Sequence, residues 1–131
     1  MRYHRLTYTY TVTTGLPPWE AFARPSVPPT HTWRPDADVF ETSDRYTVTV
    51  DLAGVTEDDL ELLLYPNALV VQGARRPPRL EADGVFHVAG IRYGPFRLEV
   101  GFAEPVSADG VTAELERGFL RVELPKLGVG R

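Results

Sequence analysis

The feature that most limits the fold of this chain is a strict alternation of apolar and polar side chains over short stretches. In RYTVTV, Tyr46, Val48 and Val50 alternate with threonines, and in FLRVEL, Leu120 and Val122 alternate with charged residues. A period of two puts each set on one face of a β-strand. Twelve prolines and eleven glycines divide the 131 residues into segments too short for long helices. The sequence therefore predicts an all-β fold.

Seven or eight short strands separated by turns indicate one antiparallel, immunoglobulin-like β-sandwich. The sequence predicts a single capped turn in VTEDDLE, with Thr56 as the N-cap. It also predicts a hairpin that turns at Arg117–Gly118. The expected strands lie in 36–41, 45–54, 60–65, 69–75, 85–94, 95–102 and 111–125.

The first 33 residues differ from the rest of the chain. Prolines at 17, 18, 25, 28 and 29 forbid long regular structure, although RLTYTYTVT alternates as a strand does. We expect a flexible N-terminal arm over 1–33, with Trp19, Phe22 and Trp33 as exposed aromatic residues. The sandwich then occupies 34–126, and 127–131 form a short tail.

The sequence offers little catalytic chemistry. The chain has no cysteine, and His4, His31 and His87 lie far apart without metal-ligand spacing. A net charge of −4 argues against nucleic-acid binding, and no apolar run is long enough to cross a membrane. We expect no catalytic residue, cofactor or metal, and a cytoplasmic location.

The stretch LELLLY is apolar on both faces, with Leu62 and Leu64 on one and Leu63 and Tyr65 on the other. A sandwich strand buries one face, so something must cover the second. Either the protein's own loops cover it or it lines a groove for a partner segment. The residues leave both interpretations open.

The order of the motifs resembles the α-crystallin domain of small heat-shock proteins. Ala113, Gly118 and Leu120 meet that family's signature of Ala, four residues, Gly, one residue, Leu, within AELERGFL. RYGPF, from Arg92 to Phe96, is similar to the family's Arg-Tyr-Gly-x-Phe block. Residues 33–75 resemble the opening half of the domain. Together the resemblance covers about residues 34–126.

The resemblance implies an ATP-independent chaperone that holds unfolding client proteins under heat or other stress. It also implies a homodimer, with larger homo-oligomers open, in which a strand from the loop 77–91 crosses to the partner. Val85–Ala89 is the expected crossing strand, paired with the partner's DVFET segment. The expected dimer residues are Val39, Phe40, Val85, Phe86, His87, Val88, Arg92 and Tyr93.

For clients, the resemblance implies a groove between two strands, and the apolar arm adds further contacts. The expected client-binding residues are Trp19, Phe22, Trp33, Leu62, Leu63, Leu64, Val111, Ala113 and Leu115. Leu127 and Val129 have the spacing of the family's C-terminal motif, which plugs this groove on a neighbouring dimer. They follow Lys126 too closely to reach another dimer. We therefore expect weak tail-mediated assembly, with YTYTV (Tyr8, Tyr10, Val12) as an alternative plug.

Two other functions fit the same sequence. The first is a CS-type sandwich that acts as a co-chaperone on one dedicated partner. A monomeric state would favour this function over the strand-exchanged dimer. The second is an enzyme or small-ligand sandwich, which would need a pocket with convergent polar groups.

Overall fold

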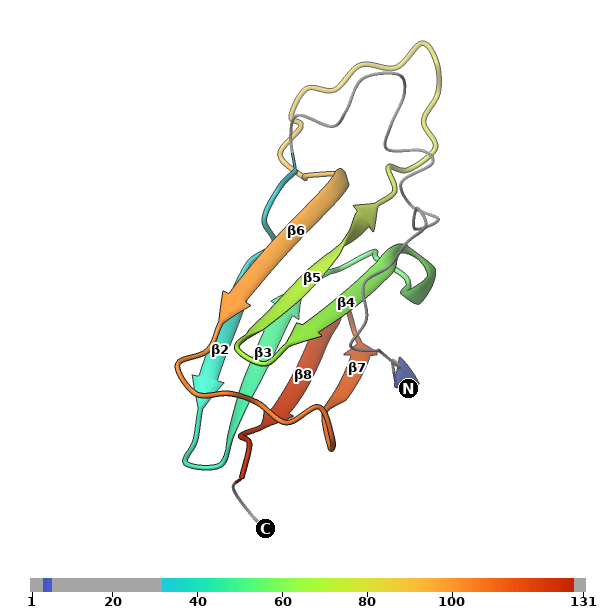
Figure 1. Ribbon diagram of the computed structural model, residues 1–131. Coiled ribbons are helices and arrows are strands. Elements are labelled where there is room, and N and C mark those ends of the chain that lie inside the picture. The colour runs from blue at the N-terminus through green and yellow to red at the C-terminus, as the bar shows by residue number, and fades with distance from the viewer. Residues whose placement is uncertain (1–3, 6–31, 129–131) are drawn as a thin grey trace.

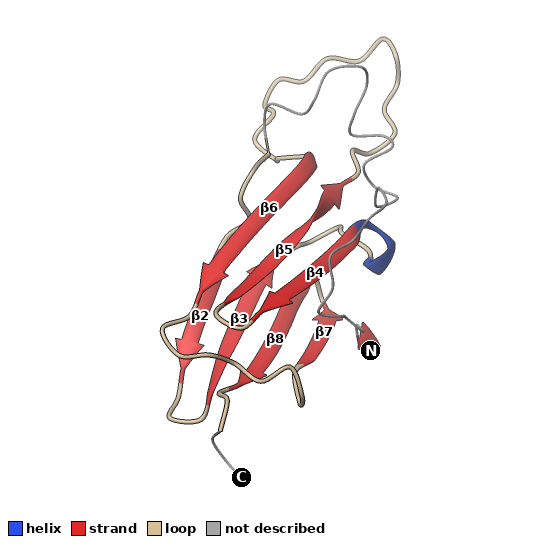
Figure 2. Cartoon of the chain, viewed as in Figure 1, coloured by secondary structure: helices blue, strands red, loops and turns tan. Residues whose placement is uncertain are grey.

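The computed structural model describes residues 4–5 and 32–128, which form two antiparallel sheets packed face to face (Figures 1 and 2). The five-stranded sheet has the order β1-β7-β8-β3-β2, and the three-stranded sheet has the order β4-β5-β6. One 3-10 turn, η1 (Glu57–Asp59), precedes β4. The strands are β1 (His4–Arg5), β2 (Ala37–Glu41), β3 (Arg45–Asp51), β4 (Leu60–Tyr65), β5 (Ala68–Arg75), β6 (Gly94–Gly101), β7 (Thr112–Glu116) and β8 (Phe119–Pro125). The all-β sandwich predicted from the sequence is confirmed.

The core lies between the inner faces of the two sheets. Val48 and Val50 of β3 are completely buried, while Thr47 and Thr49, which alternate with them, are half-buried on the outer face. Leu120 and Val122 of β8 lie opposite Val50 and Val48 and are also completely buried. The three-stranded sheet contributes Leu62, Leu64, Leu69, Val71, Phe96, Leu98 and Val100. The alternation in the sequence therefore decides which face each side chain takes.

The β7–β8 turn explains the spacing of Ala113, Gly118 and Leu120. Arg117 and Gly118 have φ values of 55° and 84°, the left-handed pair that a tight two-residue hairpin needs. A Cβ at Gly118 would lie 3.1 Å from Cα of Ala53, so only glycine fits there without movement. Ala113 and Leu120, on either side of the turn, are both completely buried. The predicted turn at Arg117–Gly118 is confirmed.

The turn before β4 begins where the sequence predicts, with Thr56 in the N-cap position. The Thr56 side chain makes no capping hydrogen bond, however. The segment is fixed instead by its backbone, because Asp59 N–H donates to the Thr56 carbonyl at 3.0 Å. The close packing of Gly73 in β5 against the carbonyl oxygen of Asp59 holds the turn on the sheet.

Two expectations about chain segments differ from the structure. Residues 85–89 form a loop that projects beyond the ends of both sheets (Figure 1), and within residues 4–5 and 32–128 they have no ladder partner, which a strand requires. Trp33, expected in the arm, instead forms a parallel bridge with Phe96 at the edge of β6. Of the strand predicted near the N-terminus, only β1 is described. Tyr8, Tyr10, Val12, Trp19, Phe22 and Val129 lie outside the described residues.

Candidate functional site

The exposed edge of the five-stranded sheet is β2. It pairs with β3 through five residue pairs, and the described residues place no strand on its other side. All five β2 residues are exposed, among them Val39 at 50% and Phe40 at 66%. An apolar edge strand with free backbone groups is a ready template for pairing with another strand.

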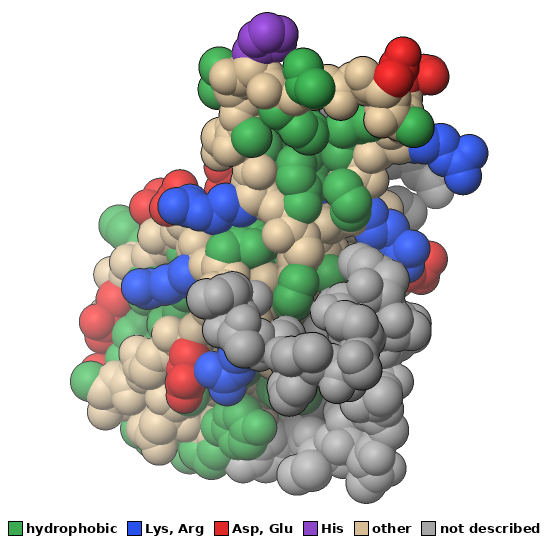
Figure 3. Space-filling model, turned by 90° about the horizontal axis from the view of Figure 1, so that it is seen from above, with side chains coloured by type: hydrophobic (Ala, Val, Ile, Leu, Met, Phe, Trp, Pro, Cys, Tyr) green, Lys and Arg blue, Asp and Glu red, His purple; other side chains and the backbone are tan. Residues whose placement is uncertain are grey.

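The connection from β5 to β6, residues 76–93, carries the other exposed apolar group. Val85, Phe86 and Val88 are 79%, 65% and 84% exposed, and Ile91 is 65% exposed. Seen from above, hydrophobic side chains gather along this projecting loop (Figure 3). His87 and Arg92 are also exposed, as is Tyr93 at 37%. All eight predicted dimer residues are therefore open to solvent in the single chain.

The loop is anchored at its start by an ion pair. Arg76 donates from Nε and Nη2 to the two carboxylate oxygens of Asp59, at 2.5 Å and 2.8 Å. The Asp59 side chain is only 4% exposed. The hydrogen bond to Asp59 raises the pKa of Arg76 above its ordinary value, which keeps the guanidinium charged. Two parallel hydrogen bonds fix the orientation of the Arg76 guanidinium on the Asp59 carboxylate as well as the distance between them.

The end of the loop is anchored by Trp33. Its indole Nε1 donates to the carbonyl of Gly94 at 3.1 Å, and its ring lies 5.3 Å from that of Phe96. The guanidinium of Arg75 stacks over the indole at 4.5 Å. Backbone hydrogen bonds join Trp33 to Pro95 and Arg97. Trp33 thus closes the edge of β6 and is half-buried, which limits its use as an arm contact.

The groove expected from the sequence would lie on the opposite side of the sandwich, along β4, an outer strand of the three-stranded sheet, and β7, which lies next to the outer strand β1 of the other sheet (Figure 1). A hollow of about 340 Å³ opens there, lined by Val55, Thr56, Glu57, Asp58 and Leu115. Leu63, Val111 and Leu115 are half-buried. Leu62, Leu64 and Ala113 belong to the core at 7%, 3% and 0% exposure, so they cannot contact a client in the folded chain.

The N-terminus already occupies part of this side. In the register of β1 with β7, His4 lies opposite Leu115 and Arg5 opposite Glu114. At the other end of the chain, Leu127 is 55% exposed. The β7 edge is thus paired by a segment of the same chain over these two residues.

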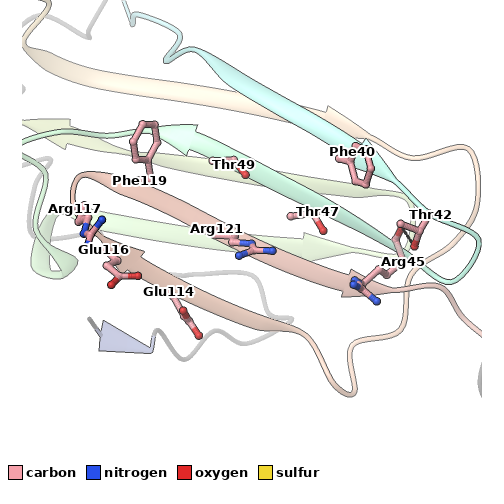
Figure 4. Close-up of a pocket in the computed structure, with 10 residues that line it drawn as sticks. All are labelled: Phe40, Thr42, Arg45, Thr47, Thr49, Glu114, Glu116, Arg117, Phe119 and Arg121. Atoms are coloured by element: carbon pink, nitrogen blue, oxygen red, sulfur yellow. Dashed lines mark hydrogen bonds between the residues drawn. The ribbon is translucent and has the colours of Figure 1, made fainter. Parts of the chain in front are cut away.

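A second hollow, of about 530 Å³, lies on the outer face of the five-stranded sheet (Figure 4). Phe40 and Phe119 stand at its two ends, with Thr47, Thr49 and Arg121 between them. Its described lining residues include no histidine, cysteine or serine. Arg121 is paired with Glu123 at 3.4 Å.

The described residues also offer no metal cluster and no membrane-spanning helix. No group of three or more metal-binding side chains occurs within residues 4–5 and 32–128. In that same part of the chain, no helix has the length and apolarity to span a membrane.

Sequence reasoning identified the exposed edge and loop, but it missed the contacts that fix them. Asp59 and Arg76 are 17 residues apart, and Trp33 and Gly94 are 61 apart. Nothing in the sequence around a charged or aromatic residue indicates which distant residue it will contact in the fold. The one available hint was an acidic cluster at 57–59 followed by the RR pair at 75–76.

Comparison with known proteins agrees with this geometry. The family model described as "Hsp20/alpha crystallin family" matches residues 38–130. A spore protein of Stigmatella aurantiaca is 34% identical over 109 residues, which cover 83% of this chain and 62% of that protein. Small heat shock protein C4 of Rickettsia felis is 29% identical over 92 residues, covering 70% of this chain and 56% of that protein. The chain thus spans less than two thirds of the length of these curated relatives.

Solved structures share the fold. Heat shock protein 16.0 from Schizosaccharomyces pombe superposes with a TM-score of 0.66 at 28% identity, covering 72% of this chain and 87% of that one. The hspA protein from Xanthomonas axonopodis gives a TM-score of 0.66 at 26% identity, covering 74% and 97%. On this sandwich, these motifs and these relatives, the chain belongs to the Hsp20/alpha crystallin family of small heat-shock proteins, which are chaperones.

Proposed function

We propose that this chain is an ATP-independent holdase, which binds unfolding proteins through exposed apolar surface and keeps them from aggregating. The observation that carries the proposal is the exposure of apolar side chains on two segments, Val39 and Phe40 of β2 and Val85, Phe86, Val88 and Ile91 of the loop, each at least half exposed. Exposed apolar groups of this extent mark interaction sites in monomeric proteins. Because hydrophobic contact is non-directional, such a surface accepts many unfolded sequences.

Part of this exposed apolar surface serves assembly in this proposal. The segment 85–89 of one copy pairs along β2 of a second copy, which satisfies the free backbone groups of that edge. Within the segment, Phe86 and Val88 share one face and Val85 and His87 the other. Pairing would thus bury Phe86 and Val88 together. The resulting unit is a homodimer, and larger homo-oligomers remain compatible with it.

Client contact falls to the residues that are accessible. Leu63, Val111 and Leu115, which are half-buried on the β4–β7 side, remain in the proposal. Trp19 and Phe22, which lie outside the described residues, remain in it as expectations from the sequence. Leu62, Leu64 and Ala113 support these contacts from the core. The net charge of −4 helps keep loaded complexes in solution.

No catalytic step, nucleotide or cofactor enters this function. The relatives are small heat-shock proteins, a chaperone family not known as enzymes. The proposed location of the protein in the cell is the cytoplasm, as expected from the sequence.

The experiment heats a thermolabile client with the chain in nucleotide-free buffer and separates the products by size-exclusion chromatography. The proposal expects the client to elute in a soluble complex with the chain, and to pellet when the chain is omitted. A client that pellets to the same extent with and without the chain would argue against a holdase. A complex that forms only after ATP is added would contradict ATP independence.

A further inference from the structure

The ammonium group of Lys126 is buried at the end of β8, with a side-chain exposure of only 5%. It donates to a carboxylate oxygen of Glu41 at 2.6 Å and to one of Glu104 at 3.2 Å. It also lies 5.2 Å from the centre of the Tyr46 ring, over its face. A lysine is rarely this buried without partners, and here two carboxylates and an aromatic ring surround it.

The backbone around Lys126 is fixed as firmly as its side chain. Its amide donates to the carbonyl of Asp44 at 2.9 Å, and the residue pairs with Val106 in an isolated bridge. The amide of Glu104 in turn donates to the Tyr46 hydroxyl at 3.2 Å. The backbone of Lys126 is therefore held independently of Glu41, and Glu104 is a second partner of the ammonium.

Glu41, in contrast, is the last residue of the exposed edge strand β2. Every residue of β2 is exposed, and in the described part of the chain β3 is its one neighbouring strand. At the start of β2, the amide of Asp51 donates to the Asp36 carbonyl at 2.9 Å. At its end, the Glu41 carboxylate is held by Lys126. An edge strand with so little burial otherwise frays easily.

We propose that Lys126 is a positioning residue that clamps the end of β2 onto the sandwich, so that this edge is preformed to receive a strand from a second copy. The inference rests on the proposed strand exchange at β2 and names the group that prepares that edge. Preforming an edge lowers the ordering cost of pairing, and so strengthens association without any new contact between copies.

The half-exposed carboxylates make the clamp testable. Glu41 and Glu104 are 49% and 56% exposed, so water can solvate both when the ammonium is removed. Lys126→Met removes the charge and keeps an unbranched apolar stem against Tyr46. Arg97→Met is the matched control, because it deletes the cation of an exposed pair with Glu99 at 3.3 Å on β6.

The first measurement is hydrogen exchange of the full chain, comparing peptides that cover 37–42 and 68–75. We expect Lys126→Met to speed exchange in 37–42 by about fivefold or more, with 68–75 unchanged, since only the edge strand loosens. Arg97→Met should leave both peptides unchanged. Glu41→Gln should act in the same direction as Lys126→Met, and it keeps the test valid if the methionine variant does not fold.

The second measurement is self-association by sedimentation velocity. The clamp predicts that Lys126→Met weakens the dimer by about tenfold. Equal exchange in 37–42 for the wild type and both clamp variants would overturn the inference. So would equal acceleration in 37–42 and 68–75, since that marks a general loss of stability. A wild-type chain that stays monomeric contradicts the strand exchange, while exchange in 37–42 still decides whether Lys126 holds β2.

Discussion

Arg76 donates two hydrogen bonds, of 2.5 Å and 2.8 Å, to the carboxylate of Asp59. They join the start of the projecting loop to the turn before β4. The carboxylate is almost completely buried, whereas the Arg76 side chain is 58% exposed. The pair therefore fixes the root of the loop and leaves its tip free. This division between a fixed root and an accessible apolar tip suits a segment that reaches a second molecule.

Asp59→Asn tests that anchor. The amide keeps the shape of the side chain but loses the charge, so one contact with Arg76 is lost and the other weakens. We expect the thermal midpoint to fall by about 5 °C, measured by circular dichroism. Glu99→Gln, in an exposed ion pair with Arg97, should change it by less than about 2 °C. Equal midpoints for the two variants would contradict the anchoring role.

Gly118→Ala tests the β7–β8 turn. The new Cβ would press on Ala53 at 3.1 Å, and the φ of 84° is strained for alanine. We expect the free energy of unfolding in urea to fall by about 1–3 kcal/mol. Gly90→Ala is the control, since nothing lies within 4 Å of its Cβ position. Two variants of equal stability would contradict the packing argument.

Phe86→Ser tests the apolar tip of the loop in assembly. Phe86 is 65% exposed, so its removal should leave the fold of the single chain intact. We expect self-association in sedimentation velocity to weaken by about tenfold or more. Leu80→Ser replaces another exposed apolar residue of the same loop outside 85–89, and it should have little effect. Equal weakening by both variants would indicate non-specific hydrophobic association of the loop and would contradict strand pairing by 85–89.

The stability of the sandwich should fall in alkali because of Lys126. The hydrogen bond to Glu41, and then that to Glu104, raise the pKa of Lys126 above its ordinary value of 10.5. A raised pKa in the folded chain gives stability that is fully present below pH 10.5 and is lost as the pH rises through the folded value. The urea midpoint of the wild type should therefore approach that of Lys126→Met above pH 10.5. A constant difference from pH 9 to 12 would contradict this linkage.

The strands could be predicted from the sequence because their cause is local. In β3, Tyr46, Val48 and Val50 alternate with polar residues, and burial follows that alternation. The β7–β8 turn could be predicted for the same reason, since Gly118 supplies the required backbone conformation. The exposed loop and edge followed from a resemblance that the family comparison confirms.

The contacts that hold the site in place could not be predicted. Trp33 follows a proline-rich stretch, which predicts that it belongs to the arm, yet it packs on β6. Lys126 and Glu41 are 85 residues apart, and only the fold brings them together. Residues 85–89 have the composition of a strand, but a strand needs a paired neighbour, and the described part of the chain does not provide one.

The measurement that tests the proposed holdase activity most directly is light scattering from a heat-labile client, with and without near-stoichiometric amounts of this chain, in the absence of ATP. We predict that the wild-type chain suppresses the rise in scattering. Unchanged scattering up to the temperature at which the client is fully unfolded would contradict the holdase, and would favour a binding module for one dedicated partner.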